Sequence, residues 1–569
     1  MTHDSQTPAG DPTGLDPALL DDAEHNLLST PIERSFVNRL FVLGGPLSLL
    51  IAILVSLWVS WAHVPLYFVV QGDRTWVAGS TRAVRVITTS SRGNDVGRVA
   101  VAAVLEQNGQ RFGLPALQSV GQGIAQGTLP VPDGVLAGPA RLHLSAPLLP
   151  EPMDEVLELE IVARAPSREP TPMISSLPAQ YSDDTGPQPD HVKIDLRAHG
   201  RVQTGFDNQF YVRITDAQGR PWEGPIEVVM IKGELDERVA TPEQPVTLVR
   251  ARTNRLGIHA LGGALISEIL RLRVRVMSRS APTEETASRT IMLVSFPGAV
   301  TVATDRLVSD VGQELELAVT GLSGKRAVYL DVHDATGAWL ETLPPVVGQA
   351  APRPWTVPAL AGAGLLHFEA YDQMTDPGES TSVAHLQLAH TPQTVVSLRP
   401  LIDVQKASLT LPRTDKSFDA DRERIWLDEV GAMDLSADEV QHLRRWLIGT
   451  LPVTVYGPQT VLSTRARDEA AVLAFKRRWT IGLRWVMLGG GGLFLVAMAL
   501  VMAWRNANAA NKTRAALREF SDEDDREMLS SHLVIQQRTA VLRGIGIFAV
   551  MAGALVLAVV MLEALVWQY

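Results

Sequence analysis

Three long apolar stretches constrain this chain more than any other feature. Residues 40–62, 479–504 and 544–567 are each long enough to cross the roughly 30 Å hydrocarbon layer of a bilayer. Residues 40–62 carry no charge, and they begin too far from the N-terminus for a cleaved signal peptide. We therefore expect three transmembrane helices, with residues 63–478 as the large polar region between the first two.

Basic residues indicate how these spans are oriented. The connection between the second and third spans, residues 505–543, carries seven lysines and arginines, which is typical of a cytoplasmic loop. This places the polar N-terminal tail, residues 1–39, in the cytoplasm as a disordered segment. Residues 63–478 and the C-terminus then lie outside. A basic cluster at 476–478 disagrees with this orientation, which the longer loop outweighs. The arginine- and alanine-rich composition indicates a bacterium, and hence its inner membrane and periplasm.

Two charged residues lie inside the predicted spans. Arg484 precedes Trp504 by 20 residues (504 − 484), and Glu563 follows Arg543 by 20 residues (563 − 543). On antiparallel helices both would lie about 30 Å from the cytoplasmic boundary. A charge at that depth is costly unless it is paired or reaches the headgroups. We expect an intramembrane ion pair between Arg484 and Glu563, with independent snorkelling to the interface as the alternative.

The outer region is typical of antiparallel β-sandwiches. Short runs of alternating apolar and polar residues are separated by Gly, Pro, Asn and Asp, so that one face of each strand is expected to cover a core. We predict three tandem immunoglobulin-like sandwiches over 64–165, 191–296 and 297–392. A proline-rich stretch over 166–190 is predicted to be an extended linker.

The first and third of these ranges contain the same landmarks in the same order. An Asp-Arg pair is followed by a glycine and an alternating strand, and the copies lie 232 residues apart (305 − 73). A hairpin pattern at 101–112 returns at 329–340, and "LAGPARLHLSA" at 136–146 matches "LAGAGLLHFEA" at 360–370. The landmark residues are Asp73, Arg74 and Gly79 in the first range and Asp305, Arg306 and Gly312 in the third. We therefore predict that the two ranges are copies of one domain.

These landmark residues are expected to be structural turn residues. The glycine relieves a tight turn, and the arginine either hydrogen-bonds carbonyl groups or pairs with its aspartate. Contact with a ligand is the alternative role. His143 and His367 occupy matching positions in the two copies, and we expect both on an exposed strand face rather than in a metal site.

Two family resemblances rest on short motifs. "TDAQGRPWEGPIEVVM" and "TNRLGIHAL" resemble bacterial immunoglobulin-like modules, and "VATDRLVSDVGQELELAV" resembles the macroglobulin-type domains of the α2-macroglobulin family. The second resemblance implies tandem sandwiches over about 64–392. The usual Pro-x-Tyr-x-Pro-Gly between Asp-Arg and the turn is replaced by "LVSDVG" and "TWVAG". The family's thioester needs a cysteine, and this chain has none, so a covalent trap is excluded.

Residues 393–478 differ from the β ranges and are predicted to be a small α-containing, membrane-proximal segment. Ser436, followed three residues later by a glutamate, is a capping box that predicts a helix over 437–448. A second helix is expected to begin at Ser463 or Thr464 and to continue into the second span.

Composition and motifs argue against catalysis. The net charge of −11 does not suit a general nucleic-acid binder, and the absence of cysteine excludes thiolate chemistry. Phosphate-binding loops, zinc-protease motifs and nucleophile elbows are also absent from the sequence. We therefore expect no enzyme, no catalytic residue, no metal and no cofactor.

The functional expectation is a membrane protein that presents its outer domains for binding. The partner is expected to be a protein or a cell-envelope polymer that contacts strand edges and loops. The alternative is an accessory subunit of a membrane transport or signalling complex. In that case the spans and residues 505–543 would bind other membrane subunits within the lipid bilayer.

Overall fold

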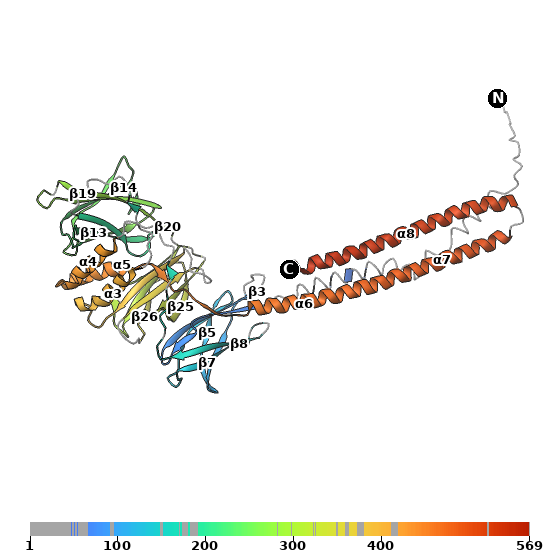
Figure 1. The fold of residues 1–569 in the computed structure, drawn as a ribbon, viewed down its shortest axis with the longest axis horizontal. Coiled ribbons are helices and arrows are strands. Elements are labelled where there is room, and N and C mark those ends of the chain that lie inside the picture. Colours follow the sequence, from blue (N-terminus) through green and yellow to red (C-terminus); the bar gives the residue numbers. More distant parts are fainter. Residues whose placement is uncertain are drawn as a thin grey trace, which may run out of the picture. The chain divides into compact units, whose positions relative to one another are not determined.

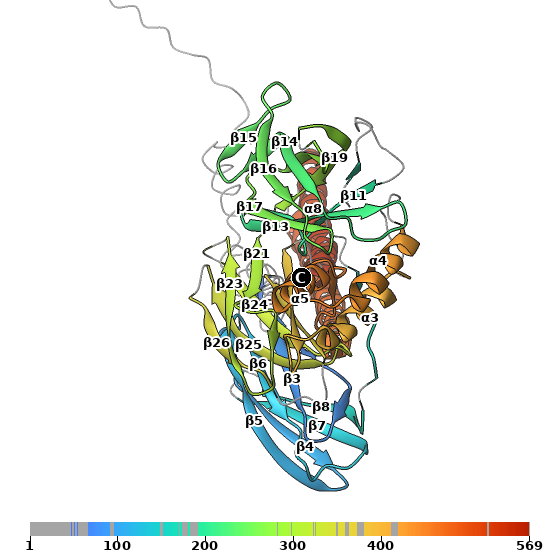
Figure 2. The same cartoon turned by 90° about the vertical axis from the view of Figure 1, so that its left-hand side faces the viewer.

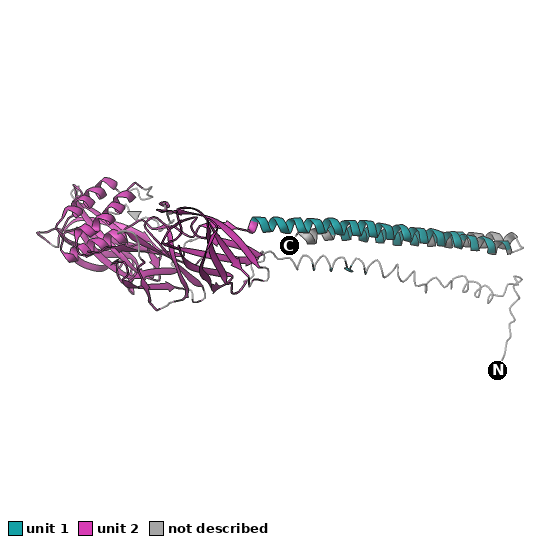
Figure 3. Cartoon of the chain, turned by 90° about the horizontal axis from the view of Figure 1, so that it is seen from below, with its two compact units in different colours: residues 1–65, 466–569 teal, residues 66–465 magenta. Residues whose placement is uncertain are grey.

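The computed structural model describes five positions between 47 and 58, and most of residues 66–567. Within 66–567 it leaves out 91–95, 148, 150–151, 165, 170, 173–179, 182–191, 282, 298, 323, 325, 349–350, 359–363, 373–379, 411–418 and 520–522. The predicted first span, residues 40–62, therefore lies mostly outside the described residues. The chain divides into two compact units (Figure 3), one formed by Leu66–Arg465 and the other by Met1–Pro65 and Ala466–Tyr569.

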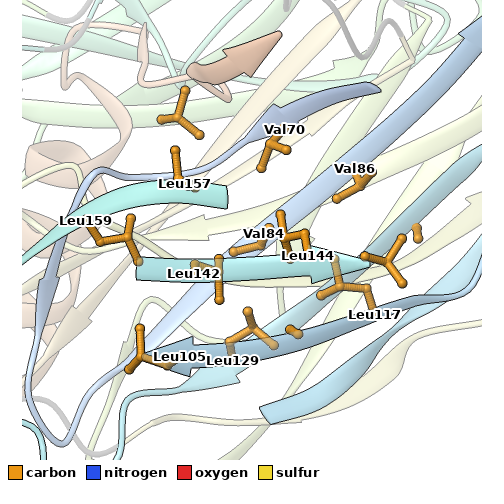
Figure 4. Close-up of a cluster of buried hydrophobic side chains, with 14 of the residues drawn as sticks. Val70, Val84, Val86, Leu105, Leu117, Leu129, Leu142, Leu144, Leu157 and Leu159 are labelled. Carbon is orange, nitrogen blue, oxygen red and sulfur yellow. The ribbon is translucent and has the colours of Figure 1, made fainter. Parts of the chain in front are cut away.

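The first β region, residues 66–162, forms one sheet together with a strand from much later in the chain. Its strands are β1 (Leu66–Gln71), β2 (Thr75–Val77), β3 (Thr81–Ser90), β4 (Val101–Gln107), β5 (Gln110–Gly121), β6 (Ile124–Pro130), β7 (Gly138–Ala146), β8 (Met153–Val162) and the late strand β30 (Thr460–Ser463). The strand order is β2-β8-β7-β4-β5-β6-β3-β1-β30. Strands from both halves of this sheet contribute alternate apolar side chains to one core (Figure 4), as the alternating pattern predicts.

The third β region, residues 300–388, repeats this arrangement. Its strands are β21 (Val300–Thr304), β22 (Val308–Ser309), β23 (Glu314–Gly321), β24 (Ala327–His333), β25 (Trp339–Val347), β26 (Arg353–Thr356), β27 (Leu365–Tyr371) and β28 (Thr381–Leu388). The order β21-β23-β26 matches β1-β3-β6, and the order β22-β28-β27-β24-β25 matches β2-β8-β7-β4-β5. Even the parallel pairing of β2 with β8 returns in β22 and β28. The two ranges that share sequence landmarks therefore share one strand order.

The second β region, residues 192–297, has the same underlying order, which sequence comparison did not detect. Its strands are β11 (Val192–Ala198), β12 (Gln203–Thr204), β13 (Asp207–Asp216), β14 (Pro225–Leu235), β15 (Arg238–Ala240), β16 (Val246–Arg252), β17 (Ile258–Ala264), β18 (Ile269–Met277), β19 (Glu285–Val294) and β20 (Phe296–Pro297). One sheet runs β11-β13-β17, and in the other β19, β18, β14 and β16 are successive neighbours. Two short strands in the predicted linker, β9 (Thr171–Pro172) and β10 (Gln180–Tyr181), pair with β29 (Thr454–Val455) and β19.

Residues 393–463 pack into the β unit. They contain a 3-10 turn η2 (Val395–Leu398) and the helices α3 (Arg399–Ser408), α4 (Ala420–Ala432) and α5 (Ala437–Gly449). The capping box at Ser436 is confirmed, and α5 ends one residue beyond the predicted helix. The apolar faces of the helices join Tyr211, Leu256 and Ile258 of the second β region in one core. The segment therefore does not form a separate stalk, because its amphipathic helices bury their apolar faces against a sheet.

The other unit contains long apolar helices. They are α6 (Arg465–Trp485), a π-helical turn η3 (Val486–Gly490), α7 (Gly491–Glu519) and α8 (Glu523–Trp567). Helix α6 begins directly after the predicted start at Ser463 or Thr464. Among the described residues two helical segments, Arg465–Lys512 and Val541–Val560, are long and apolar enough to span a membrane, which supports membrane association for two of the three predicted spans. The described part of residues 505–543, expected to be a cytoplasmic loop, is helical throughout and belongs to α7 and α8 (Figure 1).

Candidate functional site

One face of the third region's five-stranded sheet is polar and yet buried. The opposite face of the same strands is apolar and belongs to the region's own core. The polar side chains alternate with those core residues on β24, β27 and β28, and none is more than 9% exposed. They are Tyr329, Asp331, His333, His367, Glu369, Tyr371 and His385. Strand pairing places His367 beside both His333 and His385, and Asp331 beside Glu369.

The first β region covers part of this face. Strand β25 of the third region packs against β3 and β6 of the first (Figure 2), and Arg85 on β3 lies at this contact. Its guanidinium donates to an Asp331 carboxylate oxygen at 2.9 Å, to the Tyr371 hydroxyl at 2.6 Å and to the Gln126 side-chain oxygen at 2.8 Å. Arg85 and Asp331 are both fully buried, so this ion pair fastens one β region to another.

Aromatic rings complete the surroundings of Arg85. The guanidinium carbon lies 5.1 Å from the ring centroids of both Tyr329 and Trp339. Burial opposes the charge, yet Asp331 and Tyr371 hold the pKa of Arg85 above its ordinary value. A buried cation with a carboxylate partner, several acceptors and ring faces is fully satisfied, which is the condition under which a buried ion pair is tolerated. We name this group the Arg85 junction.

Residues 454–457 cover another part of the polar face. Both backbone amides of Tyr456 and Gly457 donate to the Glu369 carboxylate, at 2.5 and 3.0 Å. From the other side Arg168 donates to the carbonyl oxygens of the same two residues. His367 Nε2 lies 3.1 Å from the Thr454 carbonyl oxygen, so a neutral imidazole can donate there. Burial raises the pKa of Glu369 to about 7 although the two amide hydrogen bonds oppose this shift.

The histidines of the polar face are held neutral. Burial lowers the pKa of His333 and of His367 to about 3, and it lowers the pKa of His385 well below its ordinary value. The Tyr456 ring centroid lies 5.4 Å from that of His333 and 5.1 Å from that of His367. These rings therefore act as apolar packing surfaces as well as hydrogen-bonding groups.

The sequence-based expectation for His367 is wrong. The alternation correctly placed its side chain on the face opposite the core, but that face is covered by other parts of the chain and His367 is only 6% exposed. Its counterpart His143 has a side chain that is 32% exposed and lies 3.2 Å from Glu106. The same position in two copies of one strand order thus has two different environments.

A second buried arginine joins the second β region to helix α4. Arg213 on β13 donates to Glu423 of α4 at 2.7 Å and to Asp195 of β11 at 2.8 Å. Its guanidinium carbon lies 5.0 and 5.2 Å from the rings of Trp426 and Trp446. Although burial opposes ionisation of Asp195, the charges of Arg213 and Arg197 lower the pKa of this carboxyl group to about 2. We name this group the Arg213 junction.

The first predicted turn lies against the third β region. Arg74 donates to the Val461 carbonyl oxygen at 2.7 Å, which is the first of its two expected roles. A carboxylate oxygen of Asp73 accepts from the Trp339 amide at 2.8 Å, and burial raises the pKa of Asp73. Gly79 has φ +68°, a conformation that favours glycine. Asp73 therefore also connects the first turn to strand β25 of the third β region.

The second predicted turn is exposed and self-contained. Arg306 pairs with Asp305 at 2.8 Å, and Asp305 also accepts from the Glu316 amide at 3.0 Å. Gly312 has φ +76°. The two copies of the turn thus use the two different arginine roles that the sequence left open, and both require a glycine in the left-handed region.

The proposed pair of Arg484 and Glu563 stays a prediction, because the Glu563 side chain lies outside the described residues. Within the part of the chain that the structure describes, no group of three His, Asp or Glu side chains is arranged to hold a metal ion. Sequence reasoning missed Arg85, Arg213 and Glu369. A signal existed for Glu369 alone, which is the accumulation of aromatic, His and acidic residues on the presumed solvent face of "YLDVH" and "LLHFEAY".

Among solved structures the chain has partial matches of low sequence identity. A Salmonella alpha-2-macroglobulin shares 10% identity over 58% of this chain and 23% of its own length, with a TM-score of 0.15. A trypsin-activated alpha-2-macroglobulin from Escherichia coli shares 11% identity over 58% and 24%, with a TM-score of 0.16. Red sea bream transglutaminase shares 13% identity over 35% and 32%, with a TM-score of 0.14.

The chain spans about a quarter of the length of the alpha-2-macroglobulins. No protein-family model matches the chain, and no curated protein matches it.

Proposed function

We propose that this chain is a non-enzymatic membrane protein that presents three macroglobulin-like, immunoglobulin-like sandwiches in the periplasm of a bacterium. Their partner is another protein or a cell-envelope polymer. One observation carries the proposal: buried arginines tie the parts of the unit over Leu66–Arg465 to one another. The Arg85 junction joins the first β region to the third, and the Arg213 junction joins the second to helix α4. Arg444 of α5 donates to Gln387 on β28 of the third region.

Fixed junctions favour binding because less conformational entropy is lost when the β regions associate with a partner. A partner that contacts loops or strand edges of several β regions then meets a surface that is already organised. Strand β16 is one such edge, since among the described strands it pairs along its length only with β14. An extended segment of a partner could add to its other side through backbone hydrogen bonds.

The alternative function, an accessory subunit of a membrane complex, is favoured by a different observation. The π-helical turn η3 ends in Gly489 and Gly490, and α7 begins with two more glycines. A methyl group added at Gly489, Gly490 or Gly492 would meet no atom of the described residues within 4 Å. Small residues with open space beside them allow another helix to approach closely. Gly491, by contrast, already faces Leu555 of α8.

Photo-crosslinking in intact cells tests the proposal. A photoreactive residue replaces Arg250 on the exposed side of β16, and a matched control carries it at the buried Val228 of β14. We expect a crosslinked partner from position 250 and none from position 228. Failure to crosslink from β16 and from the exposed loops of the other β regions would contradict the proposal.

A domain exchange distinguishes the two functions. In one variant residues 479–569 are replaced by an unrelated membrane anchor, and in the other residues 66–465 are removed. Under the proposal the partner stays with the first variant and is lost from the second. The opposite result would establish the accessory-subunit function instead.

A further inference from the structure

A short segment between helix α5 and strand β30 is clamped onto titratable side chains. Residues 454–457, which we call the latch, begin with strand β29, and β29 pairs with β9. The Tyr456 and Gly457 amides donate to Glu369, and their carbonyl oxygens accept from Arg168. The latch is therefore held on one side by a carboxylate and on the other by a guanidinium.

Two histidines lie under the latch beside Glu369. His367 contacts the Thr454 carbonyl oxygen, and His333 Nε2 lies 3.6 Å from a Glu369 carboxylate oxygen. Gly337 leaves room for the latch, because a Cβ there would lie 2.3 Å from the Tyr456 ring. The charged and titratable groups that face this cluster from the surrounding elements are Arg85 of β3, Arg168, Asp331 of β24, Asp334, His385 of β28 and Tyr456.

We propose that the latch is a pH-dependent switch, which closes onto the polar sheet face near neutral pH and is released in acid as His333 and His367 take up protons. Protonation would place one cation at His333, close to Arg168, and a second at His367, close to His333, so that like charges would repel under the latch. The proposal concerns the latch alone and holds for any partner of the β regions.

The two histidines favour release in acid. In the closed latch burial lowers the pKa of His333 and of His367 to about 3, whereas solvent exposure returns each to its ordinary value of 6.5. Release therefore takes up two protons as the pH falls below 6.5. Each proton taken up changes the ratio of open to closed latch about tenfold per pH unit.

Glu369 acts in the opposite direction over part of this range. Burial raises its pKa to about 7 in the closed latch, against an ordinary value of 4.5. Between 7 and 4.5 the closed latch therefore holds a proton that the open latch loses. The net uptake on release is about one proton between about pH 6.5 and 4.5 and about two below that. The two effects cancel near pH 7, so the latch closes most tightly there.

Hydrogen exchange of the full chain in detergent micelles, measured by mass spectrometry, tests the switch. The exchange rates of the peptide covering residues 454–457 are corrected for the intrinsic effect of pH. We expect the open fraction to rise about tenfold per pH unit between about pH 6.5 and 4.5. Strand β7, in the core of the first β region, should stay protected over the same range.

Three variants separate the contributions. In the variant Glu369→Gln the side chain at position 369 no longer titrates, so release takes up two protons. The open fraction should then rise about a hundredfold per pH unit. In the double variant His333→Phe, His367→Gln the direction should reverse, because Glu369 is the last of the three groups in this proton balance that still titrates. The control His442→Gln, at an exposed position on α5, should behave as the parent chain does.

The proposal is overturned by any of three results. The first is exchange of residues 454–457 that does not depend on pH in the parent chain. The second is a Glu369→Gln variant with the parental slope. The third is loss of protection in strand β7 together with the latch, which would show global unfolding rather than local release.

Discussion

Replacing Arg85 by methionine should weaken the contact between the first and third β regions strongly. Methionine retains much of the apolar stem but removes the charge, which leaves Asp331 buried with no cation. Removing one partner of a buried ion pair costs about 3–5 kcal/mol, because the remaining charge is left uncompensated. The Tyr371 hydroxyl still donates to Asp331, which places the expected cost at the lower end, about 3 kcal/mol.

The assay is native-state hydrogen exchange of β25, the strand that packs on β3. A loss of about 3 kcal/mol corresponds to roughly a hundredfold faster opening. The matched control is the double variant Arg85→Met, Asp331→Leu, in which the whole ion pair is replaced by apolar side chains. Because such replacements are often neutral, most of the lost protection should return. The reasoning would be refuted if Arg85→Met cost less than about 1 kcal/mol, as the loss of an exposed ion pair does. It would also be refuted if the double variant protected β25 from exchange no better than Arg85→Met alone.

Three further predictions concern local stability. Gly79→Ala and Gly312→Ala should each cost about 1–2 kcal/mol in thermal unfolding because both glycines have positive φ. The loss should be larger at Gly79, where the methyl group would lie 2.9 Å from an Asp133 carboxylate oxygen, and equal losses would contradict this. Ser436→Ala should cost about 1 kcal/mol, seen as faster exchange in the first turn of α5, and unchanged exchange would exclude the cap. Arg213→Met should cost about 3–5 kcal/mol in denaturant unfolding, and a cost typical of surface pairs would show that its carboxylates are solvated.

The positions of strands and turns, and their return in the third β region, could be predicted from the sequence because they follow from local patterns. The glycine after each Asp-Arg pair and the alternating residues after it report on backbone conformation and on one buried face. The equivalent hairpins then fix which strands are neighbours. The capping box likewise reports on the first turn of one helix, and the observed helix begins where it predicted.

The environment of the second face of a sheet could not be predicted in this way. Alternation shows that His367 lies opposite the core, but it cannot show that residues 454–457, 87 residues further along the chain at Thr454, cover it. The same limit applies to Arg213, which meets Glu423 of a helix 210 residues away. A polar face that is buried by distant segments has the same sequence pattern as one that faces water.

The pairing of β1 with β30 has a consequence for the order in which the chain can fold during synthesis. Residues 460–463 supply the last strand of a sheet whose neighbouring strand is residues 66–71, and Phe68 and Thr464 exchange hydrogen bonds at its edge. The ribosome must add almost four hundred residues between these two strands. Until then the edge of β1 is an open template for another chain, so the newly made first β region is the part most exposed to mispairing.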